Sequence, residues 1–388
     1  MRAIRYFGLA VLILATGFAH SEAAVDHPQS ELRAQFQSIL DGLNEDSLDK
    51  FHAAISASDM TQRIFGTRLI DPQIQDLLRD DFKSSIEQWF AESFPNTGGK
   101  EIIGTLIDFQ EQGNQGSALV RYALPGYRYA YHRYDLQMDD RGRIIITDWL
   151  NYLMANRFSE AAGEFLVSMM PSDPAARRML DMDSPTQRQV FQMRELLKAY
   201  RDKQADRYFN IVEDMDPTLQ RERAILERSL RMAELSSDRV RYKAVVLGLL
   251  EKYPDEPLYF LTYIDFFTGT RDFERGLNTL VRFQESLGAD DGAAFARMSA
   301  FALALGENDD SVTHALRAIE AEPTLEVGWW SLLRARTRTK DYAGAIEAMS
   351  RLEDDFGHVL DPQKLAKDRF LRVLVRQQEY IDWDETRR

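Results

Sequence analysis

The sequence of 388 residues contains no cysteine. This absence excludes thiol nucleophiles, zinc–thiolate centres, iron–sulfur clusters and redox-active cysteine pairs. It also excludes disulfide bonds, which many exported proteins use for stability. We therefore expect packed hydrophobic cores to stabilise the protein, and its hydrophobic content of 44% is ordinary for a globular chain.

Basic residues are also fewer than acidic ones. The chain has 48 Lys and Arg against 62 Asp and Glu, which gives a formal net charge of −14 at pH 7. Proteins that bind nucleic acids or anionic membranes generally carry a basic surface. We therefore expect no nucleic-acid partner, although a local basic patch remains compatible with this composition.

The familiar motifs of catalysis and metal binding are absent as well. The sequence has no Gly-rich phosphate loop, no Gly-x-Ser-x-Gly elbow and no His-Glu-x-x-His helix, and its six histidines are scattered. Acidic pairs such as Asp139-Asp140 and Asp309-Asp310 lack the spacing of a calcium loop, so we interpret them as solvated turn residues. We predict no metal site and no cofactor, and a binding protein is favoured over an enzyme.

The N-terminus lacks an apolar run of the roughly 20 residues that a membrane-spanning helix needs. Instead, Arg2 and Arg5 precede a shorter apolar run over 6–18, and small residues follow up to Ala24. This order is typical of a secretory signal peptide over 1–24. We predict a periplasmic or secreted mature protein without stable membrane insertion; an uncleaved membrane anchor is the alternative.

The region 25–170 is predicted to be an α+β domain. Apolar residues at helical spacing predict helices over 29–43, 47–55 and 72–94, with Ser47 capping the second, and a return to helix over 159–170. Between them, β-branched and aromatic residues separated by turn signals predict an antiparallel meander over 101–110, 117–124, 127–138 and 143–153.

This order of helices and a curved sheet resembles the nuclear-transport-factor-like, or cystatin-like, cone over residues 29–154. Proteins with that fold include small-molecule binders, isomerases, dehydratases and dimerisation modules. The resemblance therefore implies a fold and no single function.

Two residues of this domain could carry chemistry, namely Asp148 and His132. An unpaired carboxylate is costly to bury among apolar residues, and Asp148 alternates along its strand with Ile144, Ile146, Leu150 and Tyr152. Asp148 is therefore either a polar anchor or general base in a pocket, with His132 nearby, or a member of a structural ion pair, which we favour. Alternation also predicts one face with Tyr127, Tyr129, Tyr131 and Arg133, and another with Arg128, Ala130, His132 and Tyr134.

After two proline-bearing breaks over 171–185, which we interpret as a linker, the region 186–388 is predicted to be helical. Within it a pattern recurs every 34 residues, since Phe295 is followed by Trp329 and Met298 by Leu332 at that spacing. A fixed period of this length is typical of stacked helix–turn–helix units.

These positions resemble the tetratricopeptide repeat family. The best copy has Trp329, Leu332, Lys340-Asp341-Tyr342, Ala345 and Leu352, and Phe260 and Phe295 lie in phase with Trp329 in earlier copies. The resemblance implies an all-α solenoid whose neighbouring repeats share a continuous core. A last helix over 363–380 is predicted to cap it.

By this resemblance, partners bind in a concave groove lined by the first helix of each repeat. The matching positions are Leu261, Asp265, Ala296, Ala300, Trp330, Arg334 and Arg338. Trp330 would give apolar contact while Arg334 and Arg338, on one helical face, bind carboxylates of an extended peptide. Alternatively, the arginines pair with nearby Glu322, Glu326 or Asp341 and are merely solvated.

The sequence thus predicts an exported adaptor or scaffold that binds protein or peptide partners through its repeats. The alternative is a small-molecule-binding or enzymatic N-terminal domain, of isomerase or hydrolase type, whose repeats recruit a substrate. A deep pocket containing Asp148 would favour the alternative, whereas a cone filled by tyrosine and isoleucine side chains would oppose it.

Overall fold

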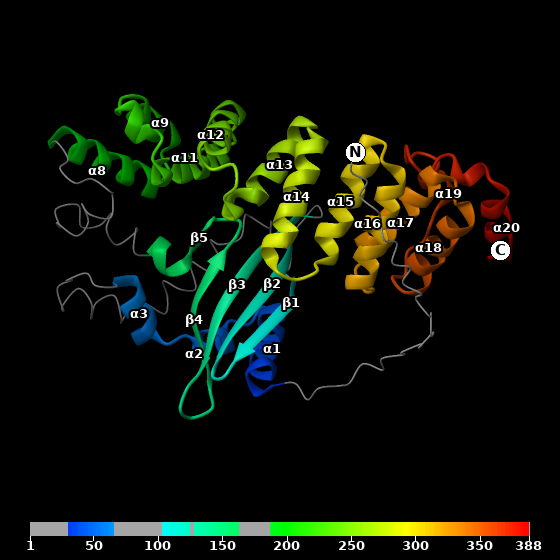
Figure 1. The fold of residues 1–388 in the computed structure, drawn as a ribbon, viewed down its shortest axis with the longest axis horizontal. Helices are drawn as coiled ribbons and strands as arrows, with labels where there is room; N and C mark the ends of the chain where they lie inside the picture. The colour runs from blue at the N-terminus through cyan, green and yellow to red at the C-terminus, as the bar shows by residue number, and fades with distance from the viewer. Residues whose placement is uncertain (1–29, 66–102, 125–127, 163–186, 388) are drawn as a thin grey trace, which may run out of the picture.

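The computed structural model describes residues 30–65, 103–124, 128–162 and 187–387. Residues 187–387 form an elongated array of helices, and a sheet with its own helices lies along one side of that array (Figure 1). The predicted signal peptide, the helix over 72–94 and the linker over 171–185 lie outside the described residues. Within the described ranges, no helix combines the length and apolarity that a bilayer crossing requires.

Three helices open the described chain: α1 (Glu31–Asn44), α2 (Asp49–Ala54) and α3 (Ala57–Phe65). The first two confirm predicted helices, whereas α3 was not predicted. The predicted cap at Ser47 is wrong, because α2 begins at Asp49; the backbone N–H of Ser47 donates to the carbonyl of Gly42 at the end of α1. The residue at the N-cap of α2 is Leu48, whose side chain makes no capping bond.

The sheet is an antiparallel meander in the order β1-β2-β3-β4-β5. Its strands are β1 (Ile103–Gln112), β2 (Gln115–Leu124), β3 (Arg128–Met138), β4 (Ile144–Asn151) and β5 (Asn156–Arg157). The four longer strands confirm the predicted meander, and the short β5 was missed. A helical turn begins at Phe158, where the return to helix was expected, and its described part ends at residue 162.

The two faces of the sheet belong to two different cores. Ala130 and Tyr134 pack with Phe36 of α1 on one face, while Tyr131 packs with Phe283 of the helical array on the other. The alternation predicted along β3 is therefore confirmed. Since Leu119, Tyr131 and Tyr152 join the core of the array, the sheet and the array are packed as one body.

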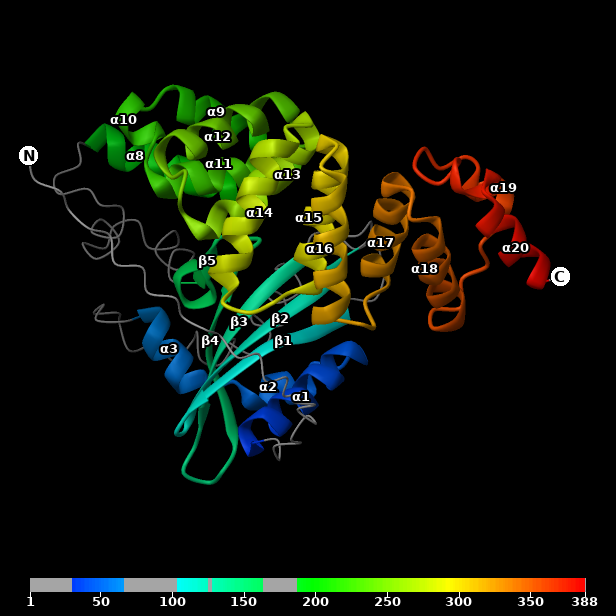
Figure 2. The ribbon, with the colours of Figure 1, turned by 45° about the vertical axis from the view of Figure 1, so that its right-hand side comes forward.

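The array consists of antiparallel helices that stack side by side (Figure 2). They are α8 (Gln187–Arg201), α9 (Ala205–Glu213), α10 (Pro217–Gln220), α11 (Arg223–Ser236), α12 (Arg239–Lys252), α13 (Phe260–Thr270), α14 (Phe273–Leu287), α15 (Gly292–Leu305), α16 (Asn308–Ala321), α17 (Glu326–Thr339) and α18 (Tyr342–Asp354). Together with the sheet domain they form an α+β fold joined to a helical repeat, as the sequence predicts.

The turn inside each helix pair repeats the same backbone geometry. The first helix ends at a left-handed residue, which is Ser237, Arg271, Gly306 or Lys340 in successive pairs. An aspartate follows in three of the four pairs and accepts hydrogen bonds from backbone N–H groups of the next helix. In the remaining pair Glu307 makes no such bond. This N-cap explains why an Asp recurs at the turn.

The predicted single capping helix over 363–380 is wrong. The chain instead forms α19 (Pro362–Leu365), a run of turns, a 3₁₀ helix η2 (Leu374–Arg376) and α20 (Gln378–Thr386). The Asp368 carboxylate accepts from the backbone N–H groups of Phe370, at 2.7 Å, and Leu371, at 3.3 Å. Such local side-chain bonds compete with helix continuation. The segment still covers the array end, because Leu365, Leu371, Leu374 and Tyr380 are buried in its core.

Candidate partner-binding site

The predicted grouping of Asp148 with Ile144 and Ile146 is wrong. On β4, Asp148 lies opposite Asp135 and Ile146 lies opposite Leu136, so Thr147 is an extra residue in the ladder. One inserted residue reverses the alternation of the side chains that follow. Ile144 and Ile146 accordingly lie in the core under α1, whereas Leu150 and Tyr152 face the array.

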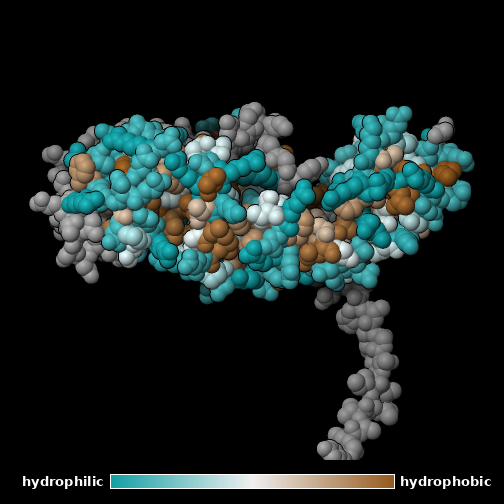
Figure 3. Space-filling view, turned by 90° about the horizontal axis from the view of Figure 1, so that it is seen from above, coloured by the Kyte–Doolittle hydropathy of each residue, from teal (hydrophilic) through white to brown (hydrophobic). Residues whose placement is uncertain are grey.

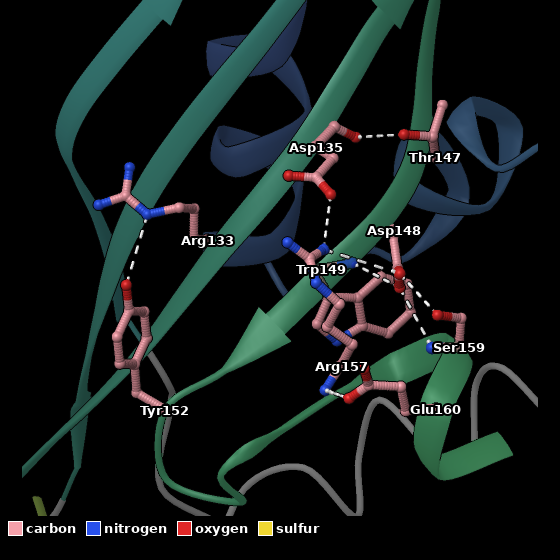
Figure 4. A network of polar contacts seen from close by, with 9 residues as sticks. All are labelled: Arg133, Asp135, Thr147, Asp148, Trp149, Tyr152, Arg157, Ser159 and Glu160. Carbon is pink, nitrogen blue, oxygen red and sulfur yellow. Dashed lines mark hydrogen bonds and ion pairs between the residues drawn. The ribbon is translucent and has the colours of Figure 1, made fainter. Parts of the chain in front are cut away.

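Asp148 is 2% exposed and its carboxylate is used structurally. It accepts hydrogen bonds from the Ser159 hydroxyl, at 2.6 Å, and the Ser159 backbone N–H, at 3.1 Å (Figure 4). Arg157 lies 3.7 Å from Asp148 and 2.6 Å from Asp135. Asp148 therefore holds the helical turn after β5 against the sheet, which agrees with the ion-pair interpretation.

His132 lies in the core between the sheet and the N-terminal helices. Its Nδ1 is 3.0 Å from the Tyr134 hydroxyl, which in turn is 2.6 Å from the Tyr122 hydroxyl. Burial lowers the pKa of His132 to about 3, so the imidazole is neutral near pH 7. His132 and Asp148 have separate sets of polar contacts, and the structure does not bring them together as an acid–base pair.

Aromatic side chains fill the described space between the sheet and the N-terminal helices. Trp149 stacks on Phe158 with ring centroids 4.0 Å apart, and Phe51 lies edge-on to Trp149 at 5.7 Å. Tyr134 and Ile146 are buried in the same core. Within the described residues, aromatic and aliphatic side chains therefore occupy the space between the sheet and the N-terminal helices. Among the described residues, no group of three or more His, Asp or Glu is placed to hold a metal ion.

A polar network that sequence reasoning missed joins the sheet to the array. Arg121 of β2 donates through Nη1 to Asp291 at 2.5 Å, and through both Nη atoms to Glu322 at 2.8 Å. The Tyr131 hydroxyl donates to the second Asp291 oxygen at 2.6 Å, and that oxygen also accepts from the backbone N–H of Ala294. Asp291 is thus both the N-cap of α15 and the counter-ion of Arg121.

The centre of this network is buried. Arg121 is 3% exposed and Asp291 is fully buried. Burial by itself would lower the pKa of Arg121, but the charge of Asp291 and the hydrogen bond with Glu322 raise it well above its usual value. The signal in the sequence was an arginine inside the apolar strand 118–124, where a charge needs a buried partner.

The first predicted groove residues are largely covered. Leu261 is 7% exposed, because α13 is apolar on most of its surface and its neighbours enclose it. Ala296 is buried too. Asp265 accepts from Arg297 at 2.7 Å and is about one third exposed, at 36%. Leu261 therefore offers little surface to a partner, which corrects its predicted role, while Asp265 remains accessible beside Arg297.

Trp330 and Arg334 of α17 are brought together, as the helical spacing predicts. The Arg334 guanidinium lies over the Trp330 ring, 5.6 Å from its centroid, and its Nη2 is 3.5 Å from Asp368. Trp330 donates through Nε1 to Glu326 at 2.8 Å. Arg338 is exposed and forms no ion pair with a residue that the structure describes.

The acidic partners expected for these arginines are engaged elsewhere. Glu322 binds Arg121, Glu326 lies 2.9 Å from His358, and Asp341 lies 3.4 Å from Arg336. The partner of Arg334 is instead a residue of the C-terminal segment, a contact that the predicted continuous helix did not anticipate.

A hollow of about 270 Å³ lies next to Arg334. It opens between α15, α17 and the turns after α19, and its lining includes Ala300, Leu303, Ser331, Arg334, Arg369 and Phe370.

On the face opposite the sheet, the surface is mainly hydrophilic and its apolar residues form small separate groups (Figure 3). A partner on that face would meet mostly polar side chains.

Fold and site together define an α+β domain packed on a helical-repeat array with a hollow near its C-terminal end. No protein-family model matches the sequence, and no curated protein matches it either. Among solved structures, the chain is similar to one described as the crystal structure of PilW, a widely conserved type IV pilus biogenesis factor. The TM-score is 0.34 with 11% identity, over 52% of this chain and 93% of that chain.

Proposed function

We propose that the protein is an exported adaptor that binds a protein or peptide partner through the face formed by Trp330, Arg334 and Arg338. The observation that carries this proposal is the environment of Arg334. Its guanidinium lies over the Trp330 ring, is partly exposed to solvent and borders a hollow. Arginine stacked on an aromatic ring is well suited to recognise carboxylates, because its planar fork stays available for two parallel hydrogen bonds.

The position of the sheet supports this choice of face. Its polar contacts to the array reach Asp291, Glu322 and the carbonyl of Leu287, which lie at the ends of α14, α15 and α16. The candidate face belongs to α17 and lies outside those contacts. We propose that the N-terminal domain serves as a fixed support for the array, and that residues 1–24 direct export to the periplasm or the exterior.

The test is crosslinking of residues 25–388 in the native compartment, followed by identification of the captured proteins. We expect Arg334→Ala combined with Arg338→Ala to abolish capture of the main partner. The matched control combines Arg239→Ala with Lys243→Ala on α12, which also removes two exposed positive charges spaced four apart on one helix. Recovery of the same partners by the α17 variant would show that the face is wrongly assigned.

A further inference from the structure

The C-terminal segment contributes a second arginine to the hollow beside Arg334. Arg369 lies over the Phe370 ring, 4.4 Å from its centroid, and is exposed. It forms no ion pair within the described part of the chain, so its positive charge is available. Arg334 on α17 and Arg369 on the segment thus supply two cations to one hollow, with Leu303 and Phe370 as apolar lining.

The Asp368 carboxylate contacts Arg334, but its position is fixed by other hydrogen bonds. Its Oδ1 is held by the backbone N–H groups of Phe370 and Leu371, while its Oδ2 lies 3.5 Å from Arg334 Nη2. The Asp368 and Arg334 side chains remain 25% and 37% exposed. An exposed pair at this distance is weak, because water solvates both charges. The backbone bonds would keep Asp368 in place if Arg334 turned to another carboxylate.

We propose that the hollow binds a carboxylate of a peptide between Arg334 and Arg369, and that the partner's carboxylate replaces Asp368 as the acceptor for Arg334 while Asp368 itself stays in place. This proposal rests on the proposed adaptor function and names the chemistry of its partner. A volume of about 270 Å³ lies just below the roughly 300–1,000 Å³ of small-ligand pockets, so it suits the end of a peptide or one acidic side chain. The apolar lining would receive a neighbouring hydrophobic side chain.

The probes are four fluorescein-labelled peptides based on Gly-Ser-Gly-Leu-Phe-Asp. They carry either Asp or Asn at the last position and either a free or an amidated C-terminus, and binding to residues 25–388 is followed by fluorescence anisotropy. We expect the neutral peptide, with Asn and an amide, to bind at least tenfold more weakly than the best of the other three, since charged hydrogen bonds are lost. The ranking of those three identifies a side-chain or a terminal carboxylate as the ligand. Equal binding of all four, or no binding by any, overturns the proposal.

The variants separate binding from folding. Arg334→Gln and Arg369→Gln should each weaken the best probe about tenfold or more, whereas Arg372→Gln, exposed on the same segment and outside the hollow, should leave it unchanged. Asp368→Asn keeps an acceptor for the backbone N–H groups and removes the competing charge, so it should strengthen binding about twofold to fivefold. Circular dichroism of each variant checks the fold. Weaker binding by folded Asp368→Asn would contradict the replacement of Asp368 as the acceptor for Arg334.

The two proposals fail in different ways. If crosslinking captures a partner and capture survives both Arg334→Gln and Arg369→Gln, the adaptor function stands and the carboxylate site falls. If the probes bind as expected but the mature protein captures no partner in its compartment, the site stands and the adaptor function falls.

Discussion

Two arginine–carboxylate contacts in this protein have the same chemistry and opposite consequences. Arg121 meets Asp291 at 2.5 Å with both side chains buried, and it meets the partly buried Glu322 at 2.8 Å. Arg334 meets Asp368 at 3.5 Å with both side chains partly in water. The buried contact joins the sheet to the array, whereas the partly exposed one is where we propose an exchange of partner.

The difference follows from desolvation. Burying an ion pair costs hydration that only close, well-aligned hydrogen bonds recover, and removal of one partner then leaves an uncompensated charge. An exposed pair loses little hydration and gains little. A buried ion pair with an N–O distance below about 3 Å is therefore expected to be a permanent contact. A partly exposed pair with a longer distance can be replaced by a pair with a binding partner at little cost.

The largest predicted effect breaks the buried contact. Arg121→Met should lower the free energy of unfolding by about 3–5 kcal/mol, because Asp291 stays buried without its counter-ion. Chemical denaturation of residues 25–388 measures this loss, with Arg141→Met in the exposed β3–β4 turn as the control. A loss below about 1 kcal/mol would mean that water or another residue already compensates Asp291.

A milder change removes one bond of the same network. Tyr131→Phe deletes the hydroxyl that donates to Asp291 and should cost about 1–3 kcal/mol, because a buried carboxylate oxygen loses a donor. Tyr152→Phe is the matched control, since among the described residues the Tyr152 hydroxyl meets only Arg133 Nε, at a long 3.4 Å, and the ring packs on the same Phe283. Because both variants keep the aromatic ring, equal losses would show that the hydrogen bond to Asp291 contributes no more than the long contact to Arg133.

Acid should weaken the core on the other face of the sheet. The folded-state pKa of His132, about 3, lies below the ordinary value of about 6.5, so the unfolded chain takes up the proton first as pH falls. The contribution of His132 is complete above about pH 6.5 and is lost toward pH 3, at up to about 1.4 kcal/mol per pH unit. Denaturation across this range, compared with His132→Gln, measures it. An unchanged slope in the variant would show that other groups dominate.

The smallest effect is expected at the exposed contact. Arg334→Gln should change the free energy of unfolding by less than about 1 kcal/mol, because both charges can be solvated when separated. The same variant is expected to bind the carboxylate probes much more weakly. Arg334 would then contribute to binding and little to stability. If chemical denaturation shows that the variant loses several kcal/mol in its free energy of unfolding, Arg334 has a structural role like that of Arg121.

Periodicity and turn chemistry made much of the fold predictable. The alternation along β3 identified the two faces correctly, and the recurring Asp at the repeat turns, such as Asp341, has its cause in the N-cap. Trp330 and Arg334 could be paired because residues four apart share a helical face.

The remaining features depend on contacts that no local pattern encodes. Arg121 meets residues 170 and 201 positions away, and an arginine in an apolar strand indicates only that some partner exists. The extra residue Thr147 reverses the side-chain alternation along β4, and no glycine in the sequence marks this bulge. Asp368 interrupts an otherwise helical sequence through its own side chain, which apolar spacing cannot reveal.

Hydrogen–deuterium exchange of residues 25–388, with and without the best carboxylate probe, tests the central claim most directly. Bound peptide should increase protection of backbone amides in α17 and over 366–373, and leave the β2–β3 strands and the start of α15 unchanged, because exchange reports local opening. Protection that instead changes around Asp291 and Arg121, with α17 unaffected, would contradict the account of a fixed sheet contact and an exchangeable site at Arg334.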